Sequence, residues 1–390
     1  MNKTTTLYGG GPIFDGHSLQ RGLTARFEAG KLVSLAPDSP PAANLRYVDL
    51  AGDILSPGYL DLQVNGGDGI MLNAEPNCTG LSRIAKAHRQ LGAVQILPTL
   101  ITDTPEKTAQ VINATVQATK AGMPGIAGLH LEGPHLSHSR KGAHDAALIR
   151  EMTQVDLELL LAAAEALPVL KVTLAPESAS LEQVRTLRDA GVILSLGHTN
   201  APFEQAMAYA EAGVTCVTHL FNAMSPLDHR APGVVGAALS NPDLSAGLIA
   251  DGFHVHPAAL CTAWAAKMRD PNSQGKIYLV SDAMAPAGSA ISSFELEGRQ
   301  ILRQNGRLTL RDGTLAGADL DLTTALRVLV SQCGISLEEA LTAAVTTPRQ
   351  VIGHWSDDRS ALDLAEAEFI RIQSDLSSAA PLIEPSYHEP

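Results

Sequence analysis

The chain has 390 residues, more than one hydrophobic core usually accommodates, so we expect a large domain and a smaller one. Hydrophobic residues make up 45% and charged residues 18%, as in ordinary globular proteins, and no apolar run approaches the ~18 residues of a membrane helix. The net charge of −13 argues against nucleic-acid binding through broad positive charge. The four cysteines are widely spaced, which indicates neither a disulfide framework nor a thiolate metal site. The amino terminus lacks the apolar core of a secretion signal, so we expect a cytoplasmic protein. We also expect it to be an enzyme.

The chain begins with strand-like segments, and its pattern of apolar and polar residues then changes. Residues 25–37 and 44–55 alternate apolar and polar side chains between Gly, Asp and Pro, as half-buried antiparallel strands do. From residue 55 onward, short apolar runs alternate with longer segments of helical periodicity. There are eight such runs, at residues 55–62, 93–100, 125–133, 169–176, 192–198, 214–220, 245–251 and 276–283.

This alternation predicts the fold class. Eight buried strands separated by helices are typical of an α/β protein built as a (β/α)8 TIM-type barrel. A doubly wound sheet is the structural alternative, but eight runs within residues 55–283 fit a closed barrel better.

The region after the eighth run adds further elements. Residues 294–313 have strand character, residues 322–333 and 337–346 have helical periodicity, and residues 366–374 form a last strand. A single late strand is not stable alone, so we expect it to pair with the amino-terminal strands. This predicts a small β-sandwich domain built from both termini, residues 1–55 and 353–390, beside a barrel domain of residues 56–352.

Polar side chains gather at the carboxyl ends of the apolar runs, where the active site of such a barrel lies. Scattered along the strands, they would instead lie unpaired in the barrel core, at a cost of a few kcal/mol each. The residues at these ends are Asp61, Gln63, Asn65, Glu132, His198, His219, Asp251, His254 and Asp282.

Three of these side chains have the chemistry of a metal site. Glu132, His198 and His219 would hold a divalent metal and leave a coordination position open for water. Asp282 would then move a proton from the attacking water to a leaving nitrogen, which describes metal-assisted amide hydrolysis. A single histidine at a strand end is more often structural, but three matched positions and an aspartate make that reading less favoured. His130 is read as a core or outer-shell residue, and Glu177 as either a loop acid or a ligand.

A second group of residues suits an anionic substrate. Asn222 and Arg230 follow His219 in a Gly/Pro-rich turn, and His144 lies in the basic segment RKGAHD. In an acidic protein, Arg and His beside a metal favour a negatively charged group. The alternative is that Arg230 pairs with an acidic residue at the surface.

Taken together, several motifs resemble one family, N-acetylglucosamine-6-phosphate deacetylase of the amidohydrolase superfamily. They occur in the family's order and span nearly the whole chain: LSPGYLDLQVNGG, LHLEGPHLSHSRKGAHD, LGHTNA, THLFNAM, ADGFHVHP, LVSDAM and LAG. The resemblance implies a barrel with a small β-sandwich, release of acetate from the sugar phosphate in amino-sugar metabolism, and a homodimer.

The resemblance also implies roles for individual residues. Glu132, His198 and His219 would be metal ligands, and Asp282 the general base and then acid. His144 would polarise the acetamido carbonyl. The substrate would be held by Asn222, the backbone of Ala223, Arg230, His254 and His144, with Ala316 and Gly317 closing over the pocket. Arg and His of these loops would act within one subunit or across the dimer.

Two departures from the family pattern bear on the site. Many amidohydrolases carry His-x-His on the first strand, where this chain has Gln63 and Asn65. Amide oxygens are poor ligands for a second transition metal, so we expect one divalent ion per subunit, zinc or iron, with Gln63 and Asn65 as outer-shell residues. Asp319 stands where relatives more often carry a small hydroxyl residue.

Three alternatives to this function stay open at this point. The first is the galacto epimer of the substrate, N-acetylgalactosamine 6-phosphate. The second is another N-acetylated amino sugar, either unphosphorylated or linked to a nucleotide. The third is a sugar-phosphate binding protein without catalysis, which is disfavoured because no ligand and no general base is missing. No nucleic-acid or membrane partner is expected.

Overall fold

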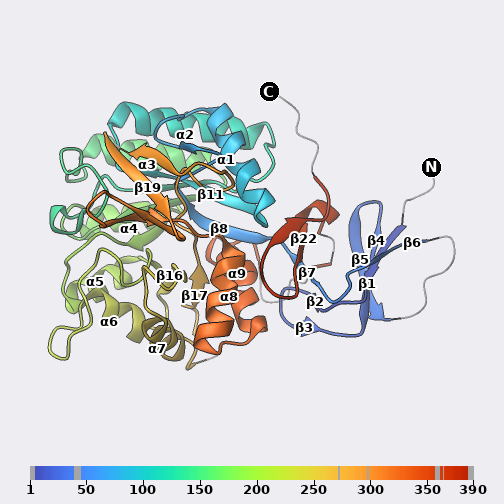
Figure 1. Ribbon diagram of the computed structural model, residues 1–390. Helices are drawn as coiled ribbons and strands as arrows, with labels where there is room; N and C mark the ends of the chain where they lie inside the picture. Colours follow the sequence, from blue (N-terminus) through green and yellow to red (C-terminus); the bar gives the residue numbers. More distant parts are fainter. Residues whose placement is uncertain are drawn as a thin grey trace.

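The computed structural model describes residues 5–38, 45–270, 273–296, 298–355, 361–362 and 364–384. Its centre is an eight-stranded parallel sheet in which the strands follow one another in chain order (Figure 1). The strands are β8 (Tyr59–Val64), β11 (Ala93–Ile101), β12 (Leu129–Glu132), β13 (Leu170–Leu174), β14 (Ile193–Leu196), β15 (Cys216–Val217), β16 (Ser245–Leu248) and β17 (Ile277–Leu279).

The first and last strands of this sheet meet at their carboxyl ends. The Asp282 amide donates to the Gln63 carbonyl at 3.0 Å, and the Asn65 amide donates to the Ala283 carbonyl at 2.9 Å. This pairing closes the sheet, which a doubly wound sheet would leave open. The predicted barrel is therefore confirmed, and each of the eight apolar runs overlaps one of its strands.

Helices surround the barrel, as the periodicity predicts. Several start at a side chain that accepts from the first turn, for example Ser180 and Ser336, each in a capping box. The helices are α1 (Cys78–Gln90), α2 (Pro105–Lys120), α3 (Gln154–Ala166), α4 (Leu181–Asp189), α5 (Phe203–Ala212), α6 (Gly233–Ser240), α7 (Pro257–Lys267), α8 (Leu322–Cys333) and α9 (Leu337–Val351).

Helix α9 extends five residues beyond the predicted segment 337–346. Its last turns are held by the buried Arg349, whose guanidinium donates to the Val345 carbonyl at 2.6 Å and to the Gly58 carbonyl at 2.9 Å. The helix thus continues through Pro348, a residue that would normally end it, and Arg349 ties these turns to the backbone at Gly58.

Both chain termini contribute to two further sheets. One has the order β23 (Ala379–Pro381), β22 (Phe369–Ile372), β7 (Ile54–Pro57), β2 (Ile13–Phe14) and β3 (Leu19–Gln20). The other has the order β5 (Lys31–Pro37), β4 (Leu23–Glu28), β1 (Thr5–Gly9) and β6 (Arg46–Asp49). Phe27 packs edge-on against both Tyr8 and Phe369, so one apolar cluster joins the two ends of the chain.

The late strand therefore pairs with amino-terminal strands, as predicted, and on its other side it pairs with β23. The first apolar run splits in two: β7 joins the terminal sheet and β8 the barrel. Between them Gly58 lies so close to β11 that a β-carbon would be 2.3 Å from Val94 Cγ1. The domain boundaries stay a prediction, and residues 1–4, 39–44, 356–360, 363 and 385–390 of the smaller domain lie outside the described residues.

An inserted antiparallel sheet lies beside the carboxyl ends of the barrel strands. It contains β18 (Ser293–Leu296), β19 (Arg299–Gln304), β20 (Arg307–Thr309) and β21 (Leu315–Ala318), as expected for residues 294–313. Ala318 forms a parallel bridge with Ala283, directly after Asp282. A short hairpin, β9 (Gly66–Gly67) and β10 (Ile70–Met71), follows β8. The insertion therefore contacts the region where the polar strand ends converge.

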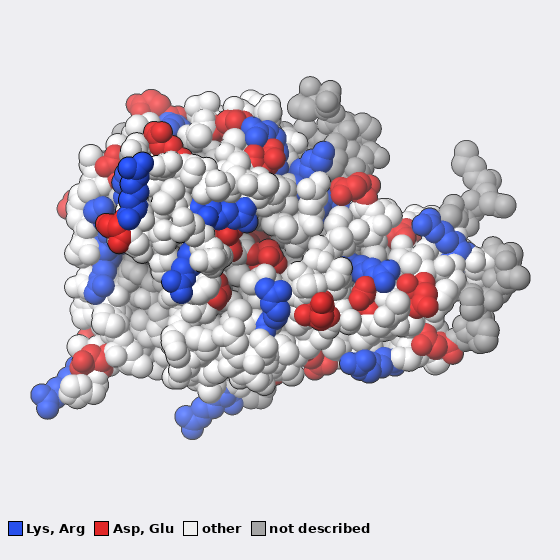
Figure 2. Space-filling view, in the orientation of Figure 1, with Lys and Arg blue, Asp and Glu red and all other residues white. Residues whose placement is uncertain are grey.

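Figure 2 shows acidic and basic side chains interspersed over one face, with wide uncharged areas between them. The negative net charge is therefore not gathered in one patch of this face. In the described part of the chain, no helix is both long and apolar enough to cross a membrane.

Candidate active site

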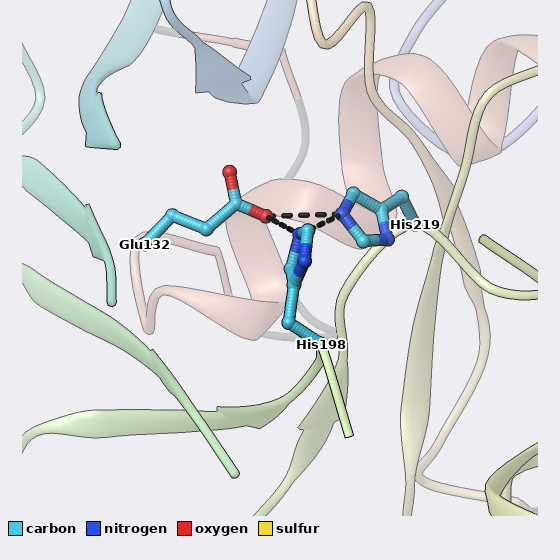
Figure 3. Close-up of side chains that lie close together, drawn as sticks. All are labelled: Glu132, His198 and His219. Carbon is cyan, nitrogen blue, oxygen red and sulfur yellow. Dashed lines mark hydrogen bonds and ion pairs between the residues drawn. The ribbon is translucent and has the colours of Figure 1, made fainter. Parts of the chain in front are cut away.

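Three barrel strands, β12, β14 and β15, bring the predicted metal ligands together (Figure 3). Glu132 ends β12, whereas His198 and His219 lie two residues beyond β14 and β15. Glu132 Oε1 is 3.2 Å from His198 Nε2 and 3.0 Å from His219 Nε2, and the two Nε2 atoms are 3.0 Å apart. Among the described residues, this buried trio has the spacing of a metal site.

The hydrogen bonds around the trio fit a cation at its centre. His198 Nδ1 lies 2.8 Å from the Arg140 carbonyl oxygen, which only accepts, so this nitrogen carries the proton. The lone pair of His198 Nε2 therefore points toward Glu132 and His219. Two imidazole nitrogens and a carboxylate oxygen at 3 Å, with the far ring nitrogen held by a carbonyl, match the usual arrangement of a metal site.

The backbone at these positions is unusual. His198, His219 and Asp282 have φ angles of 48°, 28° and 50°, in the region that non-glycine residues seldom adopt. Each such residue costs about 1–3 kcal/mol, and the surrounding structure must compensate. Such strain concentrates at functional sites, in agreement with the roles predicted for these three residues.

Asp282 is held by the two amides that stand in place of His-x-His. Its Oδ1 accepts from Asn65 Nδ2 at 2.7 Å and from Gln63 Nε2 at 3.1 Å. Gln63 Nε2 also lies 3.2 Å from both carboxylate oxygens of Glu132, so it bridges the two carboxylates. Burial, and then the charge of Glu132, raise the pKa of Asp282. The side chain therefore has an increased affinity for a proton.

His144 lies beside the ligands, with its ring centroid 4.3 Å from that of His198. The Thr102 amide donates to His144 Nδ1 at 3.3 Å, and the Thr102 hydroxyl lies 2.8 Å from the same nitrogen. Since a backbone N–H only donates, Nδ1 accepts and the ring proton lies on Nε2. Burial, and then the charge of His198, lower the pKa of His144 to about 3. His144 is thus a neutral donor.

One cavity contains most of the predicted site residues. Its predicted members are Asn65, Glu132, His144, His198, His219, Asn222, Ala223, His254, Asp282 and Gly317. Three predicted residues lie elsewhere: Gln63 is buried behind Asp282, Ala316 is buried in an apolar cluster with Met284, and Arg230 is exposed to solvent. The roles of all these residues stay predictions.

The cavity wall also includes residues that the sequence did not single out: Ile101, Gly142, Ala143, Met284 and Leu315. Gly142, Ala143 and Met284 belong to the motifs that contain His144 and Asp282, so motif position was a usable signal. Leu315 is the first residue of the LAG motif and carries the same signal. Ile101 carries none, because an apolar wall residue has the same sequence pattern as a core residue.

The comparisons with known proteins identify the family. The scan against models of protein families found no match. An N-acetylgalactosamine-6-phosphate deacetylase of Shewanella is 41% identical over 305 residues, covering 78% of this chain and 75% of the relative. The human N-acetylglucosamine-6-phosphate deacetylase is 36% identical over 351 residues, covering 86% of this chain and 83% of the relative. This chain belongs to the N-acetylglucosamine-6-phosphate deacetylase family.

Solved structures of this deacetylase family extend the likeness over the whole chain. The enzyme of Pasteurella multocida has a TM-score of 0.87 at 29% identity, covering 96% of this chain and 97% of that one. A mutant of the Mycobacterium smegmatis enzyme, in complex with N-acetyl-D-glucosamine 6-phosphate, has a TM-score of 0.85 at 28% identity, covering 97% of each chain. The resemblance predicted from the motifs is confirmed.

Two acidic residues near the deacetylase site have structural partners. Asp251 Oδ2 lies 2.6 Å from His254 Nδ1, and Asp251 Oδ1 accepts from the amides of Phe253 and His254. Asp251 thus orients the His254 ring toward the cavity. Glu177, for which the sequence left two interpretations, accepts from the Thr199 hydroxyl at 2.6 Å and the Asn200 amide at 2.7 Å. In this arrangement it stabilises the loop after His198.

Asp61 supports the deacetylase site from below. Its carboxylate is fully buried and accepts from the amides of Gln63 and Ser281, which joins the end of β8 to the segment before Asp282. Burial raises the pKa of Asp61 to about 7. The folded state therefore binds the proton more tightly than the unfolded state, so this group stabilises the fold at low pH and less as the pH rises toward 7.

We expect Asp61→Asn to remove this pH dependence. Between pH 5 and pH 8, the free energy of unfolding of the variant relative to the wild type should rise by about 2–3 kcal/mol. Urea unfolding of both metal-free proteins at the two pH values measures this difference. A difference that does not change with pH would contradict the assignment of a raised pKa to Asp61.

Proposed function

We propose that this chain hydrolyses the acetamide of N-acetylglucosamine 6-phosphate to glucosamine 6-phosphate and acetate. The observation that carries the proposal is the convergence of Glu132, His198, His219 and Asp282 on one cavity. It is supported by the names of the relatives and by the sugar phosphate bound in the mycobacterial structure.

The proposed cofactor is one divalent metal ion per subunit, zinc or iron, held by Glu132, His198 and His219. Nitrogen and oxygen ligands in this ratio suit either metal. Such an ion, when bound, supplies Lewis acidity that polarises the acetyl carbonyl and acidifies water. The amides of Gln63 and Asn65 direct N–H groups toward Asp282, an arrangement that favours one ion rather than two.

Asp282 is proposed to move the proton. Its Oδ1 is engaged by two amide donors, which leaves Oδ2 to accept a proton from the attacking water as the water oxygen bonds to the acetyl carbon. The raised pKa of Asp282 makes it a better base toward water than an ordinary carboxylate. The same proton then passes to the amide nitrogen as the C–N bond breaks, giving acetate and the free amine.

His144 is proposed to assist at the carbonyl oxygen. Because Thr102 occupies Nδ1, His144 directs its Nε2 proton away from Thr102, as a hydrogen-bond donor for the developing oxyanion. Its pKa of about 3 keeps the ring neutral throughout the physiological range, so it donates a hydrogen bond without releasing a proton. Asn222, the Ala223 backbone and His254 would then contact the sugar.

The phosphate anchor is proposed to come from a second subunit. Arg230 lies in the exposed loop 226–231, outside the cavity of its own chain, and the exposed Leu227 lies in the same loop. An apolar side chain and a cation on one loop suit insertion into a neighbouring copy, where Arg230 would meet the substrate phosphate. This makes a homodimer the proposed assembly, and a cytoplasmic location stays a prediction.

Arg230→Ala should weaken binding of the phosphorylated sugar. A charge-assisted hydrogen bond contributes about 1.5–3 kcal/mol, which corresponds to a 10–100-fold increase in KM. The kcat should change much less, because Arg230 is distant from the reacting bond. Steady-state acetate release measures KM and kcat, and light scattering measures the oligomeric state. An unchanged KM, or a wild-type monomer of full activity, would contradict this role of Arg230.

The galacto epimer is the second candidate substrate, because the Shewanella relative named for it is 41% identical to this chain. Acetate release by the metal-loaded protein from N-acetylglucosamine 6-phosphate, N-acetylgalactosamine 6-phosphate and N-acetylglucosamine tests both. The highest kcat/KM for the first sugar supports the proposal, and the highest for the second replaces it. Equal acetate release from the phosphorylated and unphosphorylated sugars would contradict the proposed phosphate site. No acetate release from any of the three would favour a sugar-phosphate binding protein without catalysis.

A further inference from the structure

The interior of the barrel directly below the metal ligands is filled by a chain of hydrogen-bonded polar side chains. The Thr173 hydroxyl lies 2.7 Å from that of Thr218, which lies 2.6 Å from the Ser195 hydroxyl. In the other direction, Thr173 Oγ1 lies 2.7 Å from His130 Nε2. All four side chains are fully buried. Apolar branched residues usually fill the interior of such barrels, so polar side chains at this position indicate a specific role.

The far end of the chain is anchored by groups that fix its direction. His130 Nε2 lies 3.3 Å from the Lys171 ammonium, which only donates, so Nε2 accepts and Nδ1 carries the proton. That proton faces Thr99 Oγ1 at 3.2 Å, and the same oxygen accepts from the Val64 amide at 2.9 Å. The polar chain therefore extends from β8 to β15.

The hydroxyl end of this chain lies directly beside the ligand positions. Thr218 precedes His219, Ser195 lies three residues before His198, and Thr173 is in register with Glu132. Gly197, which precedes His198, is fitted against the two threonines. A β-carbon at Gly197 would lie 2.7 Å from Thr173 Cγ2 and 2.9 Å from Thr218 Cβ.

The two histidine ligands follow these contacts in a backbone conformation that needs support. His198 and His219 both have positive φ angles, and such residues persist only where the neighbouring structure holds them. The Ser195–Thr218 contact joins the chain segments immediately before the two histidines, at β14 and after β15, and the Thr218–Thr173 contact ties both to β13.

We propose that Thr173 and Thr218 are positioning residues of the metal site, which hold His198 and His219 in ligating geometry through the Ser195–Thr218–Thr173–His130 chain. The inference rests on the proposed metal site and is independent of the sugar substrate. It assigns the polar barrel core a role in metal affinity that ordinary packing would not supply.

The test compares Thr173→Val with the wild type. Valine keeps the shape and removes the hydroxyl, so zinc affinity should fall about 10–100-fold, the range for outer-shell changes, in competition with a chromophoric chelator. Thr173→Ser should restore most of the affinity. The visible spectrum of the cobalt(II)-loaded protein should change in Thr173→Val, because the ligand geometry changes.

Thr115→Val is the matched control, since Thr115 is also fully buried and its hydroxyl bonds a carbonyl within α2, outside the site. It should lose stability but keep zinc affinity and the cobalt spectrum. If Thr173→Val does not fold, two other variants replace it in the test. They are Thr218→Val, and Gly197→Ala, which places a methyl group against Thr173 and Thr218.

Zinc affinity equal to that of the wild type in the folded hydroxyl variants would overturn the inference, as would equal losses in Thr115→Val. A wild-type protein that binds no zinc or cobalt would overturn both the metal site and the inference. Loss of affinity in the hydroxyl variants, together with no acetate release by the wild type, would support the inference and contradict only the proposed reaction.

Discussion

Asp282→Asn should lower kcat for acetate release by about 10²–10⁴-fold, the usual contribution of a positioned general acid–base group. The amide keeps the size of the side chain, and its oxygen still accepts from Asn65 and Gln63, so the site geometry should persist. What is lost is the carboxylate oxygen that accepts the proton of water. Metal content should stay near that of the wild type, because Asp282 is outside the proposed ligand trio.

Initial rates with N-acetylglucosamine 6-phosphate and metal analysis on the same sample measure both effects. Asp156→Asn is the matched control, because Asp156 is also a mostly buried acid but caps α3 and pairs with Arg150. It should reduce stability without a comparable loss of kcat. Near-normal turnover of Asp282→Asn would contradict the proposed proton transfer.

His219→Ala should remove the metal as well as the activity. Alanine leaves only Glu132 and His198 to hold the metal. Changes to residues that contact the ligands usually lower metal affinity about 10–100-fold, and the loss of a ligand itself should lower it further. Activity without added metal should then fall below detection. His198→Ala is expected to behave in the same way, because both Nε2 atoms face the same point.

Metal content after gel filtration, followed by titration with zinc, measures this loss. His135→Ala provides the control, because His135 is a buried imidazole whose Nδ1 faces the Arg150 carbonyl rather than the ligand trio. This variant should retain the metal. Full occupancy in both ligand variants would refute the assignment of the metal site.

The barrel and most of the candidate site were predictable from the sequence. Buried parallel strands appear as short apolar runs, and eight of them in alternation with helices have few other arrangements. Polar residues stand out at the ends of these runs because a buried strand seldom tolerates them elsewhere. Glu132, His198, His219 and Asp282 are all residues of this kind, and the structure brings them to one cavity.

Contacts between distant segments were not predictable in this way. The first apolar run divides at Gly58 because β11 lies against that glycine, and no local pattern records this approach. Arg230 follows His219 closely in sequence, yet its loop leaves the cavity and faces solvent. The amide of Gln63 reaches both Glu132 and Asp282 only because the barrel closes between its first and last strands.

The sequence by itself thus determined the class of fold, the family and the residue types of the proposed metal ligands, because these depend on residue type and order. The tertiary structure alone decided the left-handed backbone at His198, His219 and Asp282, and the tautomers of His144 and His198. It also decided the hydroxyl chain beneath the ligands. These features depend on which groups from separate strands meet in the folded barrel, and local sequence patterns carry no information about such meetings.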